Sequence, residues 1–248
     1  MASQTVPYCG LPPLPAELLH RFNLDPLLIL ILAGCVLANL IVVPGNRSRV
    51  PAAAGWAVAA VAFLSPLCAL SVALFSARVA QHMILILIAA PLIAVSLPAR
   101  ARGPGAHSLW TTGITFFVAL WFWHMPVPYD ATFTSNTVYW LMHATLFGSA
   151  ILLWRELLNH RAEGTATAFC VGALTSMQMG LLGAVLTFAG HPLFFWHLTT
   201  TWAWGLTALQ DQQLGGTLMW VPGIVLFLFA ALRSLNRLWT VLNEGKPA

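Results

Sequence analysis

Three histidines in this sequence lie near the ends of strongly apolar stretches, and each has a methionine next to it. The three pairs are His82 with Met83, His124 with Met125, and His143 with Met142. Imidazole nitrogen binds copper, zinc and iron, and thioether sulfur prefers soft Cu(I). Adjacent helical residues point about 100° apart, so both members of a pair cannot face one ion squarely. The pattern predicts a copper site with histidine ligands. The three neighbouring methionines are expected to assist capture or release of the ion, as is Met219 in the last apolar stretch.

The composition is that of a membrane protein. The chain has 248 residues, of which 59% are hydrophobic and 7% charged, against roughly 25% charged in a soluble globular domain. Seven apolar runs are long enough, or nearly so, to cross a hydrocarbon core that requires about 20 residues. They cover residues 27–43, 51–75, 78–97, 109–127, 137–158, 165–189 and 214–239. None alternates like a barrel strand, so we predict an all-α polytopic protein with seven transmembrane helices.

The basic residues predict the orientation of this bundle in the lipid bilayer. Nine of the eleven follow the first, third, fifth and seventh runs, and only Arg21 and Arg78 lie on the opposite side. Because cytoplasmic loops are rich in positive residues, the N-terminus is predicted outside and the C-terminus in the cytoplasm. The predicted parts are an external tail without a signal peptide (1–26), a transmembrane domain (27–240) and a cytoplasmic tail (241–248). Cytoplasmic anchoring accounts for the net charge of +4, so nucleic acid is not expected as a partner.

The predicted topology brings the three histidines to one depth. His82 lies about one turn inside the third run, which enters from the outer side. The link between the fourth and fifth runs contains Pro126 and Pro128 and is short, so these two runs form a hairpin with His124 and His143 at nearly the same level. The predicted metal site therefore lies in the outer leaflet.

Two acidic residues are auxiliary candidates at this level. Asp130 is predicted in a turn with Tyr129, where it either shapes the turn or stabilises an arriving cation. Asp211 precedes the last run, where it either caps that helix at its positive N-terminal end or serves the site. His20, His107 and His160 are assigned to solvated segments, and His191 and His197 to the outer link, without a defined role.

Small residues and prolines predict how the helices pack. Small side chains recur at every fourth position of the sixth run and form a stripe that another helix can approach closely. They are Gly172, Ser176, Gly180 and Ala184. Pro66 and Pro91 fall inside predicted helices, where each is expected to kink the helix or open a gap in its backbone hydrogen bonds.

The four cysteines do not predict a disulfide framework. Cys9 has no obvious partner in the sequence and is the one residue to test as a thiol. The other three lie within predicted helices and are expected to behave as small apolar residues. They are Cys35, Cys68 and Cys170.

Other functions remain open from the residues alone. One alternative is that each histidine only forms a hydrogen bond with a carbonyl or water at the membrane interface and binds no metal. Two histidines on separate helices can hold a haem, although no second pair lies near the cytoplasmic face. A copper transporter is a further alternative. The objection is that the middle of the membrane has almost no strongly polar group except Gln178, whereas transporters bind their substrates there. The last alternative is that this chain is a purely structural partner, which holds another membrane protein during assembly.

Four stretches of the sequence resemble the CtaG family of cytochrome c oxidase assembly factors, from about Phe75 to Leu238. They read Q-H-M-I-L-I-L-I-A-A-P-L from Gln81, W-F-W-H-M-P-V-P-Y-D from Trp121, M-G-L-L-G-A-V-L-T-F-A from Met179, and D-Q-Q-L-G-G-T-L-M-W-V-P-G from Asp211. The resemblance implies a seven-helix, multi-pass protein of the bacterial inner (plasma) membrane. It further implies a non-enzymatic role in maturing the oxidase, in which copper is supplied to oxidase subunits. Other copper chaperones are implied as further partners.

The resemblance also carries over to single residues. The family's histidine in helix 3 corresponds to His82, the one in W-x-W-H to His124, and the one in helix 5 to His143, while its acidic D-Q-Q-L-G-G residue corresponds to Asp211. Family members often have an acidic residue directly before the helix 5 histidine. This chain has Met142 there, so the local charge differs.

Overall fold

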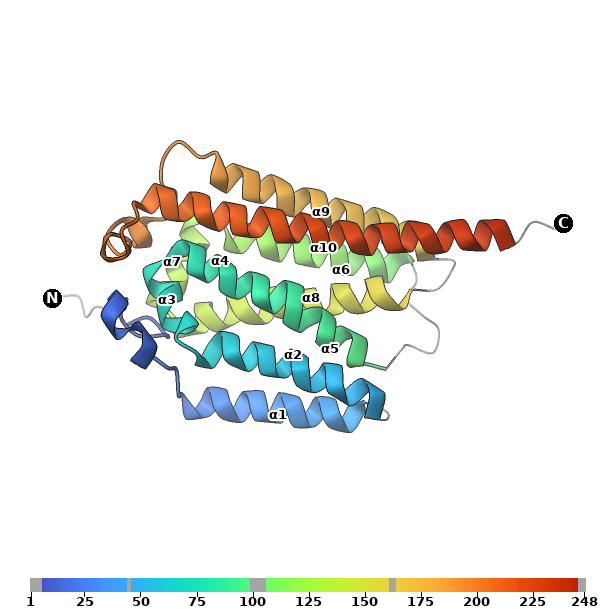
Figure 1. Ribbon diagram of the computed structural model, residues 1–248, viewed down its shortest axis with the longest axis horizontal. Coiled ribbons are helices and arrows are strands. Elements are labelled where there is room, and N and C mark those ends of the chain that lie inside the picture. The colour runs from blue at the N-terminus through green and yellow to red at the C-terminus, as the bar shows by residue number, and fades with distance from the viewer. Residues whose placement is uncertain (1–5, 44–45, 99–105, 161–163, 245–248) are drawn as a thin grey trace.

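The computed structural model describes residues 6–43, 46–98, 106–160 and 164–244. Within these ranges every regular element is a helix, as the sequence predicts. Figure 1 shows the longer helices side by side along one axis, with the N-terminal segment at one end of the bundle and the C-terminus at the other. We call these the N-terminal end and the C-terminal end. Four of the basic residues used to predict the orientation lie outside the described ranges: Arg100, Arg102, Arg161 and Lys246.

Four helical units are long and apolar enough to cross a membrane. They are α4–η2–α5 (Phe75–Ile84, Leu85–Ala89 and Ala90–Ser96), α8 (Asn136–Asn159), α9 (Thr165–Thr187) and α10 (Ala208–Glu244). Helices α2 (Asn46–Leu64) and α3 (Leu67–Ala73) make a fifth if they count as one span bent by 48°. The remaining apolar helices are α1 (Pro26–Val42), with 17 residues, and α6 (Ala106–Trp123), with 18. The chain is therefore a multi-pass membrane protein.

The unit α4–η2–α5 lies at the centre of the bundle. Its apolar window is 67% buried, the highest share among the four spans. Helix α10 contacts α4 and packs along α9, whereas α5 contacts α2 and α8. Helix α6 contacts both α8 and α9, and α1 lies at the edge of the bundle against α2 (Figure 1). Any side chain near the start of α4 is thus surrounded by other helices.

Pro66 and Pro91 disturb their helices in two different ways. At Pro66 the helix breaks, and α3 leaves α2 at an angle. Before Pro91 the span continues through the π-helical turn η2. Proline has no N–H, so the carbonyl five residues earlier, that of Ile86, loses its π-helical donor. The indole Nε1–H of Trp154 on α8 donates to this oxygen at 2.8 Å and closes the gap.

We expect Trp154→Phe to lower the free energy of unfolding by about 1–3 kcal/mol, because the ring is kept while a buried carbonyl loses its donor. Unfolding of the detergent-solubilised protein, followed by circular dichroism, measures this loss. The matched control is Trp239→Phe, since that side chain is 67% exposed. Equal effects of the two substitutions would contradict the assigned hydrogen bond.

The region around Pro126 and Pro128 is a helix and not the predicted turn. Helix α6 ends at Trp123, and a second helix, α7, covers Pro126–Thr134. Proline is favourable in the first turn of a helix, where its missing N–H has no intrahelical partner in any case. Met125 before it is extended, as a residue preceding proline prefers. The prediction that Tyr129 and Asp130 form a turn was therefore wrong.

The small-residue stripe of α9 faces α10. A Cβ atom added at Gly172 would lie 3.2 Å from Cβ of Ala231, and one at Gly180 would lie 2.8 Å from Cδ1 of Ile224. Between them, the hydroxyl of Ser176 donates to the carbonyl of Ile224 at 3.1 Å. Ala184, the fourth stripe residue, is partly exposed. The stripe thus serves contact within this chain.

The N-terminal segment is fastened to the bundle by a disulfide between Cys9 and Cys68, with a Cα–Cα distance of 5.5 Å. The expectation that Cys9 lacks a partner and that Cys68 is only a small apolar residue was wrong. The reason is the break at Pro66, which places Cys68 at the start of α3 instead of inside a long helix. Of the other two cysteines, Cys35 is partly exposed and Cys170 is exposed, and both are free.

Candidate metal site

The rings of His82, His124 and His143 lie together at the N-terminal end of the bundle. His82 is on α4, His124 is in the turn after α6, and His143 is on α8. The ring centroid of His82 lies 5.7 Å from that of His124 and 5.2 Å from that of His143. The three side chains are 1%, 5% and 2% exposed, respectively. Residues from three separate parts of the sequence therefore form one buried imidazole cluster, which we call the histidine cluster.

The end of α6 determines how the ring of His124 is held. The backbone N–H of His124 bonds to the carbonyl of Trp121 at 3.2 Å, one residue short of the α-helical partner. This leaves the carbonyl of Leu120 without its helical donor. The Nδ1 atom of His124 lies 2.7 Å from that oxygen. Because a carbonyl only accepts, Nδ1 carries the proton and the other ring nitrogen, Nε2, has a free lone pair.

The ring of His143 is held in the same way on α8. Its Nδ1 lies 3.0 Å from the carbonyl oxygen of Tyr139, one turn earlier, and must likewise be the donor. Its Nε2 is therefore also a free acceptor. Metal-bound histidines almost always donate their second ring nitrogen to a carbonyl or carboxylate, which fixes the tautomer and ring orientation. Two of the three rings are thus prepared for a ligand at Nε2.

Four ring nitrogens of the histidine cluster have no hydrogen-bond partner among the described residues. These buried atoms are Nδ1 and Nε2 of His82, Nε2 of His124 and Nε2 of His143. A buried polar atom without a hydrogen bond costs about 1–3 kcal/mol. Unpaired polar groups that persist in a buried site require a specific explanation, such as a bound ion.

The spacing of the rings fits imidazole ligation, although their present orientation does not. Metal–nitrogen bonds of about 2 Å place two imidazole centroids on one ion roughly 5–6 Å apart, and the two observed separations are 5.2 and 5.7 Å. However, no three His, Cys, Asp or Glu side chains within the described ranges are arranged closely enough to hold an ion as they stand. A bound ion would therefore require the rings to turn, and His82 is the ring that no hydrogen bond restrains.

The four auxiliary methionines differ in their exposure. Met83, Met142 and Met219 are 6%, 0% and 0% exposed and belong to one apolar core. Met125 is 50% exposed, on the surface of the turn that carries His124. Three of the four thioethers are therefore part of the apolar core, whereas Met125 is accessible from outside the bundle.

Both acidic candidates hold backbone segments in place. Asp211 accepts hydrogen bonds from the N–H groups of Phe75, at 2.6 Å, and Ser76, at 3.1 Å, and from the hydroxyl of Ser76. Asp211 lies in the first turn of α10, as predicted, and its carboxylate also satisfies the N-terminal end of α4. Asp130 accepts from the N–H groups of Phe195 and Trp196, at 3.2 and 3.5 Å. Burial raises the pKa of the Asp130 carboxyl, whereas these two N–H groups act in the opposite direction.

The link between α9 and α10 folds into the end of the bundle. It contains two short 3-10 helices, η4 (Phe195–Leu198) and η5 (Trp202–Trp204). His197 is 1% exposed, its Nδ1 bonds the carbonyl of Ala73 at 3.2 Å, and its Nε2 accepts from the hydroxyl of Tyr129 at 2.8 Å. Burial lowers the pKa of His197 to about 3, so this ring is neutral. Both nitrogens of His197 are occupied, which distinguishes it from the histidine cluster.

A comparison with protein-family models identifies the relatives of this chain. The model described as cytochrome c oxidase caa3 assembly factor (Caa3_CtaG) matches residues 43–240. The chain belongs to this family. No curated protein and no solved structure matches it. Membership confirms the resemblance seen in the sequence and implies association with cytochrome c oxidase and a non-catalytic role in its assembly.

In this family member, two buried residues beside the histidine cluster were not predicted from the sequence. The ring of Tyr139 contacts that of His143 in a tilted arrangement, with centroids 4.4 Å apart, and its hydroxyl lies 3.4 Å from Sγ of Cys9. Arg78 was assigned to the outer surface but is 1% exposed. Periodicity along α4 was a usable signal, because Arg78 lies four residues before His82 and therefore on the same helical face.

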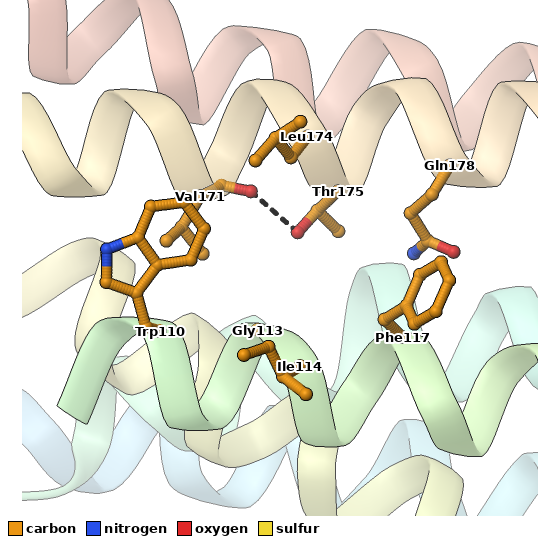
Figure 2. Close-up of a pocket in the computed structure, with 8 residues that line it drawn as sticks. All are labelled: Trp110, Gly113, Ile114, Phe117, Val171, Leu174, Thr175 and Gln178. Atoms are coloured by element: carbon orange, nitrogen blue, oxygen red, sulfur yellow. Dashed lines mark hydrogen bonds between the residues drawn. The ribbon is translucent and has the colours of Figure 1, made fainter. Parts of the chain in front are cut away.

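The chain also has a lateral apolar groove between α6 and α9, which no residue of the histidine cluster lines. Figure 2 shows this groove, of about 250 Å³, with side chains from Trp110 to Phe117 on one wall and Val171 to Gln178 on the other. Its polar groups are few: the hydroxyl of Thr175 donates to the carbonyl of Val171 at 2.7 Å, and the amide oxygen of Gln178 accepts from Nε1 of Trp121 at 2.9 Å. The groove offers no set of metal ligands.

Proposed function

We propose that this family member binds Cu(I) at His82, His124 and His143 and supplies it to cytochrome c oxidase during assembly. The observation that supports this most directly is the pair of Nδ1–H donations to Leu120 and Tyr139, which leaves two buried Nε2 atoms ready for a soft or borderline metal. Neutral imidazoles suit Cu(I), and nearby thioethers add to that preference. Copper is cargo in this proposal and leaves by ligand exchange with the oxidase.

We further propose seven membrane crossings with the N-terminal end of the bundle facing outward. The four long units, the bent α2–α3 pair, α1 and α6 add up to seven. The bond between Cys9 and Cys68 supports this orientation, because disulfides persist on the oxidising side of the bacterial membrane. The histidine cluster would then take up and release copper at the outer face.

Copper measurement tests the proposed site. We expect the purified protein, loaded with Cu(I) without oxygen and then desalted, to retain about one equivalent by elemental analysis, and the triple His→Ala variant at 82, 124 and 143 to retain none. The matched control replaces the three exposed histidines His20, His107 and His191 by alanine. It removes the same number of imidazoles and should retain copper like the unaltered protein. Equal copper in both triple variants would overturn the site.

The same preparation separates copper from haem. The rings of the histidine cluster contact one another edge to face, with interplanar angles of 82° and 70°. A porphyrin requires a flat slot between its two axial ligands, which this packing does not provide. We therefore expect a colourless preparation without a Soret band.

A further inference from the structure

Arg78 is a fully buried cation one helical turn before His82. Its guanidinium carbon lies 4.6 Å from the ring centroid of Phe133, 5.3 Å from that of Tyr139 and 6.0 Å from that of Tyr129. Its polar contacts are neutral as well: Nε donates to the hydroxyl of Ser71 at 3.2 Å, and Nη1 to that of Thr132 at 3.4 Å. Aromatic faces and hydroxyls thus hold the charge in place without cancelling it.

No carboxylate within the described ranges forms an ion pair with Arg78. The ion pair found there is between Arg21 and Glu17, at 3.7 Å. Asp130 and Asp211, at this end of the bundle, direct their oxygens to backbone N–H groups of other segments. Asp25, at the same end, accepts hydrogen bonds from the hydroxyl of Tyr8 and the N–H of Leu27. A guanidinium group does not lose its proton in proteins. Arg78 is therefore a permanent positive charge in a poorly screened environment.

This charge lies close to the histidine cluster. Arg78 and His82 are four residues apart on α4 and so share one face of the helix. The ring of Tyr139 is close to both groups: its centroid lies 5.3 Å from the guanidinium carbon of Arg78 and 4.4 Å from the ring centroid of His143. Any cation held by the rings would experience repulsion from Arg78, and this repulsion grows in proportion to the charge of the ion.

We propose that Arg78 makes the histidine cluster selective for a monovalent metal ion, Cu(I), over divalent ions such as Zn(II) and Cu(II). This inference rests on the proposed function. Imidazole alone gives little such preference, because it binds zinc and both oxidation states of copper. A fixed positive charge weakens the binding of every cation, but the free-energy penalty for a divalent ion is twice that for a monovalent one. The same repulsion assists release of Cu(I) to a client.

The inference is tested by removing or compensating the charge and measuring affinity for Cu(I) and Zn(II) separately, with competing chelators, in detergent and without oxygen. Arg78→Gln removes the charge. Ser71→Asp keeps Arg78 and supplies a carboxylate at the atom that Nε now contacts. Arg78→Lys keeps the charge and loses the planar stacking. A unit charge in a protein interior changes ion binding by about tenfold per unit of ion charge over roughly 10 Å.

We expect Arg78→Gln and Ser71→Asp to raise the affinity for Cu(I) by about tenfold and that for Zn(II) by about a hundredfold, the square of the first change. Arg78→Lys should leave the ratio of the two affinities nearly unchanged. In Arg78→Gln, the midpoint potential of bound copper should fall, because Cu(II) no longer meets the added repulsion. Melting curves of the metal-free variants identify any that fail to fold.

Three results would overturn the inference. If Arg78 has only a structural role, Arg78→Gln lowers the affinities for Cu(I) and Zn(II) by the same factor. Ser71→Asp, with Arg78 intact, then leaves the ratio of the two affinities unchanged. Equal fold-changes for Cu(I) and Zn(II) in a folded variant contradict a charge effect directly. If the unaltered protein binds neither ion, the proposed function and this inference fail together, whereas binding with an unchanged ratio in both neutralised variants rejects only the role of Arg78.

Discussion

Replacing His82 by leucine is expected to lower the affinity for Cu(I) by at least about 100-fold, the upper range seen when even an indirect partner of a metal site is removed. His82 contacts both other rings and is the one member of the cluster with two unpaired nitrogens. The measurement is Cu(I) titration against a competing chelator. The matched control is His197→Leu, which removes a buried imidazole at the same end of the bundle but one whose nitrogens are already occupied.

The stability of the same two variants should change in the opposite sense. A buried polar group without a hydrogen bond destabilises by about 1–3 kcal/mol, so His82→Leu should leave the metal-free protein as stable as before or more stable. His197→Leu breaks bonds to Tyr129 and Ala73 and should destabilise it. Residues that bind ligands often reduce stability in this way. A large loss of stability in His82→Leu, with copper affinity retained, would identify His82 as a structural residue.

Removing the disulfide is expected to have the largest effect on stability. The bond joins cysteines 59 residues apart, and the chain-entropy estimate for a loop of that length is about 4 kcal/mol. We expect the double variant Cys9→Ser, Cys68→Ser to lose about 2–4 kcal/mol, because the membrane already restricts the unfolded chain. Unfolding in detergent by increasing dodecyl sulfate measures the loss.

Two comparisons make the disulfide result specific. Replacing the free cysteines Cys35 and Cys170 by serine should have little effect by comparison. Adding a reductant should reproduce the double variant in the unaltered protein and change nothing in the double variant itself. If the reductant leaves the stability of the unaltered protein unchanged, the bond between Cys9 and Cys68 does not stabilise the fold.

The sequence was sufficient to bring the three histidines together. Helical rise and a short hairpin set the depth of His124 and His143, and the third run set that of His82, so no knowledge of tertiary contacts was required. The tautomers could not be predicted in this way. The tautomer of His124 depends on the early end of α6, which frees the carbonyl of Leu120, and that end depends in turn on how Pro126 starts α7. The tautomer of His143 depends on the contact of its ring with the carbonyl of Tyr139 on α8.

The residues that surround the cluster were harder to predict, because their partners are distant in sequence. Asp211 was assigned to its own helix, whereas its carboxylate reaches the start of α4. Gly215 assists this approach: a Cβ atom there would lie 2.5 Å from Cδ1 of Phe75 and 3.3 Å from Cα of Ser76, so a larger residue would force α4 and α10 to shift apart or the Phe75 ring to move. Arg78 was counted as a surface charge, although aromatic rings from α7 and α8 enclose it.

The π-helical turn at Leu85–Ala89 has a consequence for the register of the central span. A π turn holds about one residue more than an α turn, so residues before it are rotated by roughly 100° relative to those after it. His82 and Arg78 precede the turn, and Pro91 follows it. An uninterrupted α-helix anchored at its C-terminal half would direct His82 away from His143. The extra residue changes the helical register, so that the two halves of one span direct different faces toward their neighbours.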